Sequence, residues 1–262
     1  IDGPAGAGKS TVAKEVAKEL KIVYLDTGAM YRAVALKCLR RGTDPNDEAG
    51  VMTFLNDTEI KIAYEEGAQR IYLDGEDVSE QIRENRISRA ASDVSKLRPV
   101  RLKLVELQRQ IARSCDVVMD GRDIGTFVLP DANFKFFLTA TSEERASRRY
   151  LELLAKGEKI KYEEVLADII ARDENDSKRD FAPLKRAEDA VLAVEVHLGE
   201  DGVGIVAGDD GLKVPDHERG HRDAPFRGGW PRGFPLYGSR KRAALQRPSG
   251  RKPAPRLASP GG

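Results

Sequence analysis

The sequence feature that most constrains the fold is the glycine-rich segment Gly3–Ser10, which matches the pattern G-x-x-x-x-G-K-[ST]. Glycines are needed there because successive backbone N–H groups must turn inward around phosphate oxygens, and a side chain would obstruct them. The loop joins a buried strand to a helix whose positive N-terminal end faces the bound anion. The segment therefore predicts an α/β fold with a phosphate site near Gly3. Because the chain begins at Ile1, we expect the upstream part of the supporting strand to be missing from this sequence.

The residues of this loop are expected to bind ATP. Lys9 is expected to reach the β- and γ-phosphates, and the Ser10 hydroxyl to be a ligand of Mg²⁺. The predicted nucleotide-binding residues are Gly3, Pro4, Ala5, Gly6, Ala7, Gly8, Lys9, Ser10 and Thr11. ATP and Mg²⁺ are therefore the predicted cofactors, and Ser10 is the predicted metal ligand.

Periodicity downstream of the loop indicates that helices and strands alternate. Apolar residues recur at helical spacing up to Leu20, Ile22–Leu25 is typical of a short strand, and Thr27 is placed to cap a helix that ends at Gly42. Further helices are predicted at about 87–97, 99–111, 141 onward and 162–172, and further strands at 115–119 and 134–138. This succession predicts a parallel sheet covered by helices, with ligands at the carboxyl ends of the strands.

One segment departs from this alternation. Apolar and polar residues alternate over Ile60–Tyr64 and again over Ile71–Leu73, with the turn Glu65–Gly67 between them. Period-two alternation on both sides of a turn is typical of an antiparallel hairpin. We therefore predict a small antiparallel insert, which together with the following helix spans about residues 57–98.

Composition and cysteine usage indicate a soluble protein in a reducing compartment. The chain is 40% hydrophobic and 33% charged, which is ordinary for a globular protein. No apolar run reaches the roughly 18 residues that a membrane span needs, and no signal peptide is recognisable. Cys38 and Cys115 both lie in apolar stretches, so we expect two buried free thiols and a cytoplasmic location, with no membrane partner.

Residues 1–192 contain no histidine, since His197, His217 and His221 all follow them. A histidine-dependent hydrolytic triad is therefore excluded from this part of the chain. Phosphoryl transfer needs no protein nucleophile, because its catalysis consists of positioning and of neutralising charge. The segment Arg172–Arg179 is too polar for a core, and its mixed charges predict a mobile lid that closes on phosphates and ribose hydroxyls.

Four ordered sequence blocks together resemble the bacterial-type cytidylate kinases, which are P-loop nucleoside monophosphate kinases. The blocks are Ile1–Thr11, Leu25–Arg32, Asp120–Thr126 and Ala182–Leu184. The resemblance covers about residues 1–192 and implies the α/β nucleoside monophosphate kinase fold. It also implies that the insert forms the monophosphate-binding region and that a helical lid spans about 145–181. The implied reaction transfers the γ-phosphoryl group of ATP to CMP or dCMP.

The resemblance further implies roles for individual residues. The implied substrate-binding residues are Thr27, Arg32, Ser92, Arg101, Arg122, Asp123, Arg172 and Asp176, and the implied catalytic residues are Lys9, Arg148, Arg149 and Arg179. Arg32 and Arg122 are expected to hold the CMP phosphate, and Ser92, Arg101 and Asp123 to surround the cytosine. A carboxylate can accept from the exocyclic amino group of cytosine, whereas uracil presents the opposite pattern there, so UMP is expected to be disfavoured.

Two carboxylates have a role that the sequence leaves open. Asp26 and Asp120 stand at strand ends beside the expected ligands, where each could act on the substrate or be a structural residue at a helix start or strand end.

Residues 193–262 have a different composition, with 13 of the 24 glycines and 8 of the 13 prolines. From Arg219 onward, eleven Lys and Arg residues accompany the single acid Asp223. Such a segment buries too little apolar surface to order itself, so we expect a disordered tail and doubt the family's last strand and closing helix.

Two other functions remain open on the sequence. The chain could be a different P-loop small-molecule kinase, which the cytosine residues Ser92, Arg101 and Asp123 would discriminate. It could also be an inactive nucleotide-binding protein whose basic tail contacts RNA non-specifically. For the chain itself we expect a monomer whose partners are ATP and CMP or dCMP, without a specific nucleic-acid partner.

Overall fold

The computed structural model describes residues 1–65, 68–197 and 203–208. The chain divides into two compact units, Ile1–Lys213 and Val214–Gly262, and every described residue belongs to the first. Most of the predicted tail, including its basic part, lies outside the described residues, and its expected disorder stays a prediction.

The described unit contains a predominantly parallel sheet, as the sequence predicts. Its strands are β1 (Val23–Asp26), β5 (Val117–Asp120), β6 (Phe136–Thr139), β7 (Val191–His197) and β8 (Val203–Gly208). β1 pairs in parallel with β5, and β6 pairs in parallel with β7, while β8 adds to β7 in the antiparallel sense. In β1 and β5 the carboxyl-terminal residues Asp26 and Asp120 are register partners, so both carboxylates lie at one edge of the sheet.

The backbone of Asp2 joins the two halves of this sheet. It forms parallel bridges to Gly121 beside β5 and to Phe137 in β6. The Asp2 N–H donates to the carbonyl of Phe136 at 2.8 Å, and the Asp2 carbonyl accepts from Leu138 at 2.7 Å. Ile1 and Asp2 thus occupy the place of a strand between β5 and β6, directly before the glycine loop.

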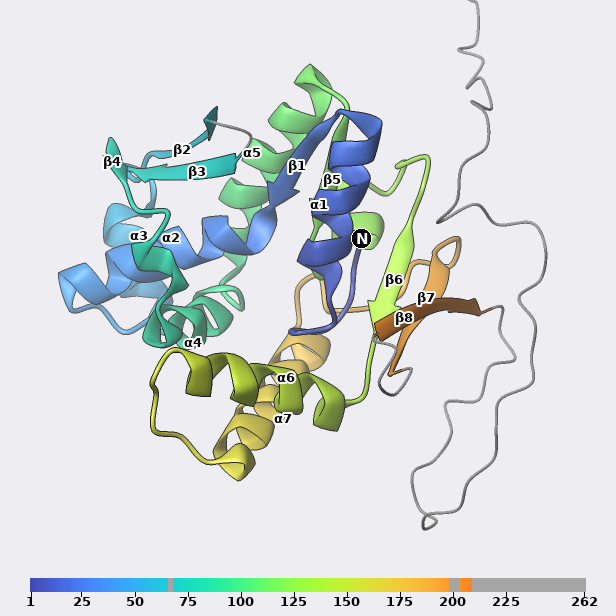
Figure 1. Cartoon of the computed structure of the whole chain (residues 1–262). Helices are drawn as coiled ribbons and strands as arrows, with labels where there is room; N and C mark the ends of the chain where they lie inside the picture. The colour runs from blue at the N-terminus through green and yellow to red at the C-terminus, as the bar shows by residue number, and fades with distance from the viewer. Residues whose placement is uncertain (66–67, 198–202, 209–262) are drawn as a thin grey trace, which may run out of the picture. The chain divides into compact units, whose positions relative to one another are not determined.

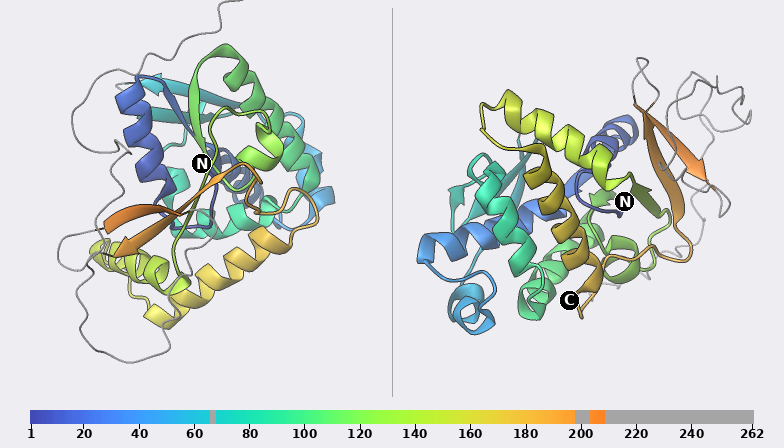
Figure 2. Two further views of the ribbon diagram at one scale, coloured as in Figure 1. Left: turned by 90° about the vertical axis from the view of Figure 1, so that its right-hand side faces the viewer. Right: turned by 90° about the horizontal axis from the view of Figure 1, so that it is seen from below.

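Helices cover the sheet and extend away from it (Figures 1 and 2). They are α1 (Lys9–Leu20), α2 (Thr27–Arg41), α3 (Glu48–Leu55), α4 (Asn85–Val94), α5 (Arg98–Ser114), α6 (Ser142–Ala155) and α7 (Tyr162–Lys178). Figure 1 shows α1 lying along β1 and β5, while α6 and α7 pair side by side. Helix α3 was not predicted, because its 8 residues are too few to establish a clear helical period. No helix among the described residues is long and apolar enough to cross a membrane.

Local sequence signals set several helix ends. Helix α6 begins near the predicted residue 141 with a capping box, in which Thr141 and Glu144 bond to each other's backbone N–H. Helix α2 ends at Gly42, whose φ of 66° is the left-handed conformation that glycine tolerates best. The expected cap at Thr27 was wrong, since the Asp26 carboxylate accepts from the Ala29 N–H at 3.0 Å and caps α2 instead.

The predicted antiparallel insert is confirmed. It consists of β2 (Ile60–Glu65), β3 (Ala68–Leu73) and the short β4 (Glu76–Asp77), all paired antiparallel. A short 3-10 turn at Gln81–Arg83 leads from the insert into α4. The insert also contacts the end of β1, because the Gln69 side chain accepts from the Asp26 N–H at 2.8 Å.

Two separate apolar clusters stabilise the described unit. The larger one packs α2, α3, α4 and α5 against the insert and the β1–β5 pair, with Leu25, Met30 and Leu104 fully buried. The smaller one lies between α6 and α7 and contains Ala146, Leu153, Val165 and Ile169. The helical hairpin at the predicted lid position therefore has a core of its own.

The sequence indicated that Arg172–Arg179 is too polar for a core. For part of this segment that expectation was wrong. Helix α7 continues through this stretch to Lys178 instead of ending at about residue 172. Asp176 and Arg179 are buried, with 4% and 8% of their surface exposed. They are buried because their opposite charges are paired, as described below.

The sequence analysis put the family's last strand in doubt, but this strand does form. β7 begins before residue 193 and continues to His197, across the boundary expected there. The expectation of two buried cysteines holds for Cys38 only; Cys115 is exposed, and both are free thiols.

Gly3 is predicted to be essential for stability because its surroundings leave no room for a side chain. Its φ is 147°, and a Cβ at this position would lie 1.9 Å from the carbonyl oxygen of Leu138. We expect Gly3→Ala to lower the free energy of unfolding by about 3 kcal/mol or more. The matched control is Gly42→Ala, where φ is 66° but no atom lies within 4 Å; it should cost only about 1 kcal/mol. Urea unfolding of both variants measures the difference, and equal losses would contradict it.

The two thiols are predicted to differ in reactivity. Burial raises the pKa of Cys38 to about 11, so little thiolate forms at neutral pH, whereas Cys115 is exposed. A thiol-specific disulfide reagent should modify Cys115 rapidly and Cys38 only on unfolding. In Cys115→Ser the rapid phase should disappear, and a rapid phase that persists would show that Cys38 is accessible.

Candidate functional site

The glycine loop adopts a conformation that only glycine tolerates well. Gly3, Gly6 and Gly8 have φ values of 147°, 74° and 75°. Gly8 is the N-cap residue of α1, so the backbone N–H groups of the first turn point toward the loop. The predicted phosphate cradle therefore has the expected position, between the Ile1–Asp2 segment and the N-terminus of α1.

Lys9 lies inside this cradle. Its side chain is buried and its Nζ donates to the carbonyl of Pro4 at 2.6 Å. Burial, reinforced by the positive charge of Arg122, lowers the pKa of Lys9 to about 7. The neighbouring carboxylates Asp120 and Asp176 act in the opposite direction. A polyphosphate bound in the loop would supply additional negative charge, and this charge would favour the ammonium form of Lys9.

Ser10 contacts a carboxylate at the end of β5. Its Oγ donates to Asp120 Oδ2 at 2.7 Å, while the Tyr24 hydroxyl donates to Asp120 Oδ1 at 3.0 Å. The predicted substrate contact Thr27 donates its hydroxyl to the Asp120 carbonyl at 2.7 Å. Burial and the nearby charge of Asp26 raise the pKa of Asp120, while burial also raises the pKa of Tyr24 and keeps it a donor.

The Ser10 and Asp120 oxygens fit the ligand chemistry of Mg²⁺. Hard oxygen donors suit this ion, which is usually held by one or two carboxylates together with substrate phosphates. No group of three or more acidic, cysteine or histidine side chains gathers among the described residues, so a metal cage made by protein alone is not found there. A site completed by nucleotide phosphates is compatible with the pair found.

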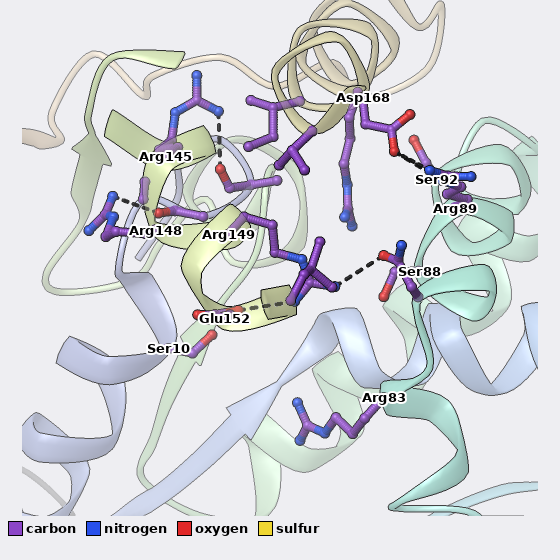
Figure 3. Close-up of a pocket in the computed structure, with 18 of the residues that line it drawn as sticks. Ser10, Arg83, Ser88, Arg89, Ser92, Arg145, Arg148, Arg149, Glu152 and Asp168 are labelled. Carbon is purple, nitrogen blue, oxygen red and sulfur yellow. Dashed lines mark hydrogen bonds and ion pairs between the residues drawn. The ribbon is translucent and has the colours of Figure 1, made fainter. Parts of the chain in front are cut away.

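A pocket of about 680 Å³ opens from the glycine loop. Its lining includes the loop residues Ala5–Thr11 and the arginines Arg32, Arg83, Arg89, Arg145, Arg148, Arg149 and Arg172. Figure 3 shows Arg145, Arg148 and Arg149 of α6 across from Ser88, Arg89 and Ser92 of α4. The pocket thus joins the phosphate cradle to the helix that follows the insert, and its charge suits a polyanion.

Three arginines of α6 lie beside the loop. Arg145 donates to the Ala5 carbonyl at 3.0 Å and pairs with Asp173 of α7 at 2.6 Å. Arg148 donates to the Gly6 carbonyl at 2.8 Å. Arg149 donates to Asn85 at the start of α4 at 3.1 Å. Arg148 and Arg149 both line the pocket, and their predicted catalytic role stays a prediction.

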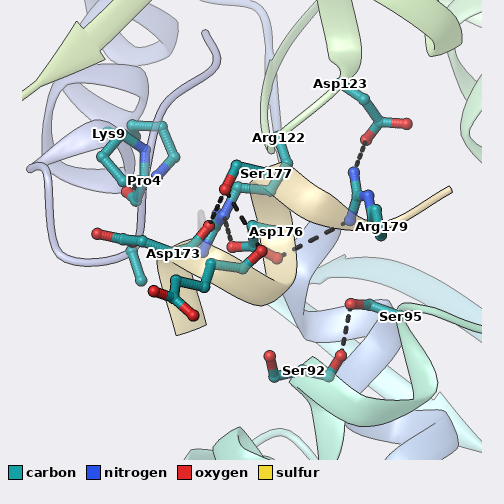
Figure 4. A network of polar contacts seen from close by, with 12 residues as sticks. Pro4, Lys9, Ser92, Ser95, Arg122, Asp123, Asp173, Asp176, Ser177 and Arg179 are labelled. Carbon is teal, nitrogen blue, oxygen red and sulfur yellow. Dashed lines mark hydrogen bonds and ion pairs between the residues drawn. The ribbon is translucent and has the colours of Figure 1, made fainter. Parts of the chain in front are cut away.

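A network of buried charges lies behind the pocket (Figure 4). Arg101 is 1% exposed and pairs with Asp123 through a short charge-assisted hydrogen bond. Arg179 lies 3.5 Å from Asp123 and 3.9 Å from Asp176, so it joins the two carboxylates. Arg122 donates its Nε to Asp176 at 2.8 Å. These pairs explain why so many charged side chains tolerate burial.

In this network the effect of burial on the pKa is outweighed by neighbouring charges for Asp176, whereas for Arg172 a neighbouring charge reinforces it. The charge of Arg122 and Arg172 keeps the pKa of Asp176 below its usual range although burial acts against this. Burial and the repulsion of Arg122 lower the pKa of Arg172 to about 10. The Nε of Arg172 and the Oγ of Ser92 have no hydrogen-bond partner among the described residues. Both residues line the pocket, and a ligand that reaches these two buried atoms would supply the missing hydrogen bonds.

Asp26 positions the other predicted phosphate-binding arginine. Its carboxylate accepts from Arg32 at 2.7 Å and lies 3.5 Å from Arg83. These two arginines lower the pKa of Asp26 against the effect of burial. Asp26 is thus a structural residue that caps α2 and also orients a side chain of the pocket.

The predicted site residues fall into two groups. Those that line the pocket are Ala5, Gly6, Ala7, Gly8, Lys9, Ser10, Thr11, Arg32, Ser92, Arg148, Arg149 and Arg172. Those that do not line it are Gly3, Pro4, Thr27, Arg101, Arg122, Asp123, Asp176 and Arg179. Arg179, predicted to be catalytic, lies in the buried network and bonds to the Ala182 carbonyl at 2.6 Å.

Sequence reasoning missed several residues of the site. Tyr24, Arg83, Arg145 and Asp173 were not predicted to be site residues. Tyr24 lies in a strand where an aromatic residue is unremarkable, and Arg83 and Asp173 become informative only through partners distant in sequence. Tyr24 and Asp26 are two residues apart in a strand, so their side chains lie on the same face of it. This spacing was the one sequence signal that could have placed Tyr24 near Asp26.

The pKa of Lys9 predicts a pH-dependent cost of burying this residue. Between pH 7 and 10 the folded state holds Lys9 neutral, while the unfolded state holds it protonated. The unfolded state then binds more protons, so stability rises with pH by at most about 1.4 kcal/mol per unit from this group. Lys9→Met should therefore be stabilised relative to the wild type most at pH 7, and this advantage should shrink toward pH 10. Urea unfolding at both values measures the trend; a constant difference would contradict it.

Comparison with known proteins agrees with this geometry. A family model described as cytidylate kinase matches residues 1–204, which extends past the limit of about 192 expected from the sequence. A cytidylate kinase of Caldicellulosiruptor bescii is 54% identical over 192 residues, covering 73% of this chain and 85% of that protein. One of Clostridioides difficile is 53% identical over 191 residues, covering 73% and 87%. One of Caldanaerobacter subterraneus subsp. tengcongensis is 54% identical over 203 residues, covering 78% and 89%. With its glycine loop, insert and arginine-lined pocket, the chain belongs to the cytidylate kinase family.

Proposed function

We propose that this chain transfers the γ-phosphoryl group of ATP to CMP or dCMP, giving ADP and CDP or dCDP. The observation that carries the proposal is the single pocket in which the loop residues Gly6–Ser10 and the substrate candidates Arg32 and Ser92 face the same space. One end of this space suits the polyphosphate and the other a nucleoside monophosphate. Family membership supports the same reaction.

The phosphoryl group passes directly between the two nucleotides. Residues 1–192 contain no histidine that could carry the phosphoryl group covalently. Lys9 binds the β- and γ-phosphates, and its ammonium form is favoured once phosphate charge enters the loop. Arg148 and Arg149, which project from α6 beside the loop, neutralise charge on the transferring group. Arg32 and Arg122 hold the acceptor phosphate.

Ser10 and Asp120 are the residues that would hold Mg²⁺. Bound there, the ion would neutralise charge on the phosphates of ATP. The protein contributes the orientation of these two oxygens, which lie 2.7 Å apart in a hydrogen bond. Asp120, whose role the sequence left open, is included on this ground.

Selectivity for cytosine rests on Ser92, Arg101 and Asp123. In the structure Arg101 and Asp123 are buried, are paired with each other and do not line the pocket, so this pair would have to open toward the base to meet the O2, N3 and exocyclic amino group of cytosine. Ser92 has an unpartnered buried hydroxyl for a further contact. A uracil would place an acceptor against the Asp123 carboxylate and leave it unpaired, which disfavours UMP.

Assembly and location follow the same reasoning. We keep the expectation that the protein acts as a monomer. Both cysteines are free, which suits the reducing environment of the cytoplasm. The hairpin α6–α7 would close over bound nucleotides and exclude water, so that ATP is not hydrolysed.

A coupled assay of ADP release tests the proposal. CMP and dCMP should be phosphorylated, and UMP and AMP should react at least about 10-fold more slowly in kcat/KM. Ser92→Ala should lower kcat/KM for CMP by about 10-fold while leaving the ATPase background unchanged. The matched control is Ser114→Ala, since Ser114 is an exposed residue at the end of α5, away from the pocket.

Three results would refute parts of this assignment. Equal rates with all four monophosphates would refute the specificity, and a different class of acceptor would favour another P-loop kinase. Tight ATP binding without CMP-dependent turnover, together with salt-sensitive RNA binding, would favour the inactive nucleotide-binding alternative.

A further inference from the structure

Tyr24 is a residue of β1 whose side chain reaches the strand next to it. Its hydroxyl donates to Asp120 Oδ1 at 3.0 Å, while Ser10 donates to the other oxygen, Oδ2, at 2.7 Å. Among the described residues, these two hydroxyls are the side-chain partners of the Asp120 carboxylate. Because each oxygen has its own donor, rotation of the carboxylate about its Cβ–Cγ bond would break both hydrogen bonds.

The position of Tyr24 is itself fixed from several sides. β1 and β5 are in parallel register, with Tyr24 opposite Val118 and Asp26 opposite Asp120. The Tyr24 carbonyl accepts from the hydroxyl of Tyr64 in the insert at 2.9 Å. Lys14 of α1 places its Nζ 5.8 Å from the centre of the Tyr24 ring. The tyrosine is therefore held by the sheet, the insert and α1 together.

We propose that Tyr24 is a positioning residue that orients Asp120 and Ser10 for the metal–nucleotide complex. Its hydroxyl keeps Oδ1 occupied, so that Oδ2 stays directed at the Ser10 hydroxyl and the glycine loop. The inference rests on the proposed function, in particular on Mg²⁺ held near Ser10 and Asp120. Groups that orient metal ligands from behind commonly change metal affinity by about 10–100-fold when removed.

The experiment compares nucleotide binding with and without the metal in the full chain. The variant is Tyr24→Phe, which keeps the ring and removes only the donor. The matched control is Tyr72→Phe, since the Tyr72 hydroxyl also donates to a carboxylate, that of Glu65 at 2.8 Å, but lies in the insert outside the pocket. The probe is a fluorescent ATP analogue, titrated in EDTA and in excess Mg²⁺.

In the wild type, Mg²⁺ should tighten binding of this probe. In Tyr24→Phe the Kd measured with Mg²⁺ should rise about 10-fold, while the Kd in EDTA stays within about twofold of the wild type. The Mg²⁺ concentration for half-maximal turnover should rise in parallel, with KM for CMP unchanged. Tyr72→Phe should leave all these values unchanged, and Tyr24→His, which restores a donor on a ring, should recover part of the Mg²⁺ effect.

Three outcomes would overturn the inference. If Tyr24→Phe retains the full Mg²⁺ effect, or loses affinity equally with and without Mg²⁺, Tyr24 has no positioning role and the proposed reaction is untouched. If the wild type shows no Mg²⁺ effect although it phosphorylates CMP, the metal assignment fails, and the role of Tyr24 fails with it. Thermal melting checks that each variant is folded.

Discussion

The site depends on the way in which Asp2 ties the chain together. Its backbone bridges β5 to β6, and its carboxylate accepts from the backbone N–H groups of Ile124 at 2.8 Å and Gly125 at 2.7 Å. One residue thus sets both the spacing of the sheet before the glycine loop and the path of the chain directly after Asp123. Burial raises the pKa of Asp2, yet the two backbone N–H donors favour its carboxylate form. The phosphate cradle and Asp123, the predicted cytosine contact, are consequently built on one anchor.

The second organising feature is the chain of alternating charges behind the pocket. Arg101, Asp123, Arg179, Asp176 and Arg122 compensate one another, so their burial is tolerated. The residues come from α5, the loop after β5 and the end of α7, and their pairing therefore links the sheet to the helical hairpin. A ligand that engages any member alters the balance for the others.

Much of this fold could be predicted from the sequence because its signals are local. The glycine loop, the helix start at Thr141 and the alternation over Ile60–Tyr64 each depend on a few neighbouring residues, and each formed as predicted. What could not be predicted depends on partners far apart in the chain. Asp176 and Arg179 are buried only because Arg122 and Asp123 meet them, and Asp26 rather than Thr27 caps α2 because its carboxylate also pairs with arginines. Tyr24 entered the site in the same way, through Asp120 in a neighbouring strand.

The separate core of the α6–α7 hairpin has a consequence for the energetics of closure. Since Ala146, Leu153, Val165 and Ile169 pack with one another and not with the main core, a tilt of the hairpin would keep this apolar surface buried, while it would have to open the ion pairs of Asp176 and Arg179 with the loop after β5. Such a movement breaks mainly polar contacts and changes the heat capacity little. In hydrogen exchange, the hairpin would behave as a cooperative unit distinct from the sheet, with its own opening free energy.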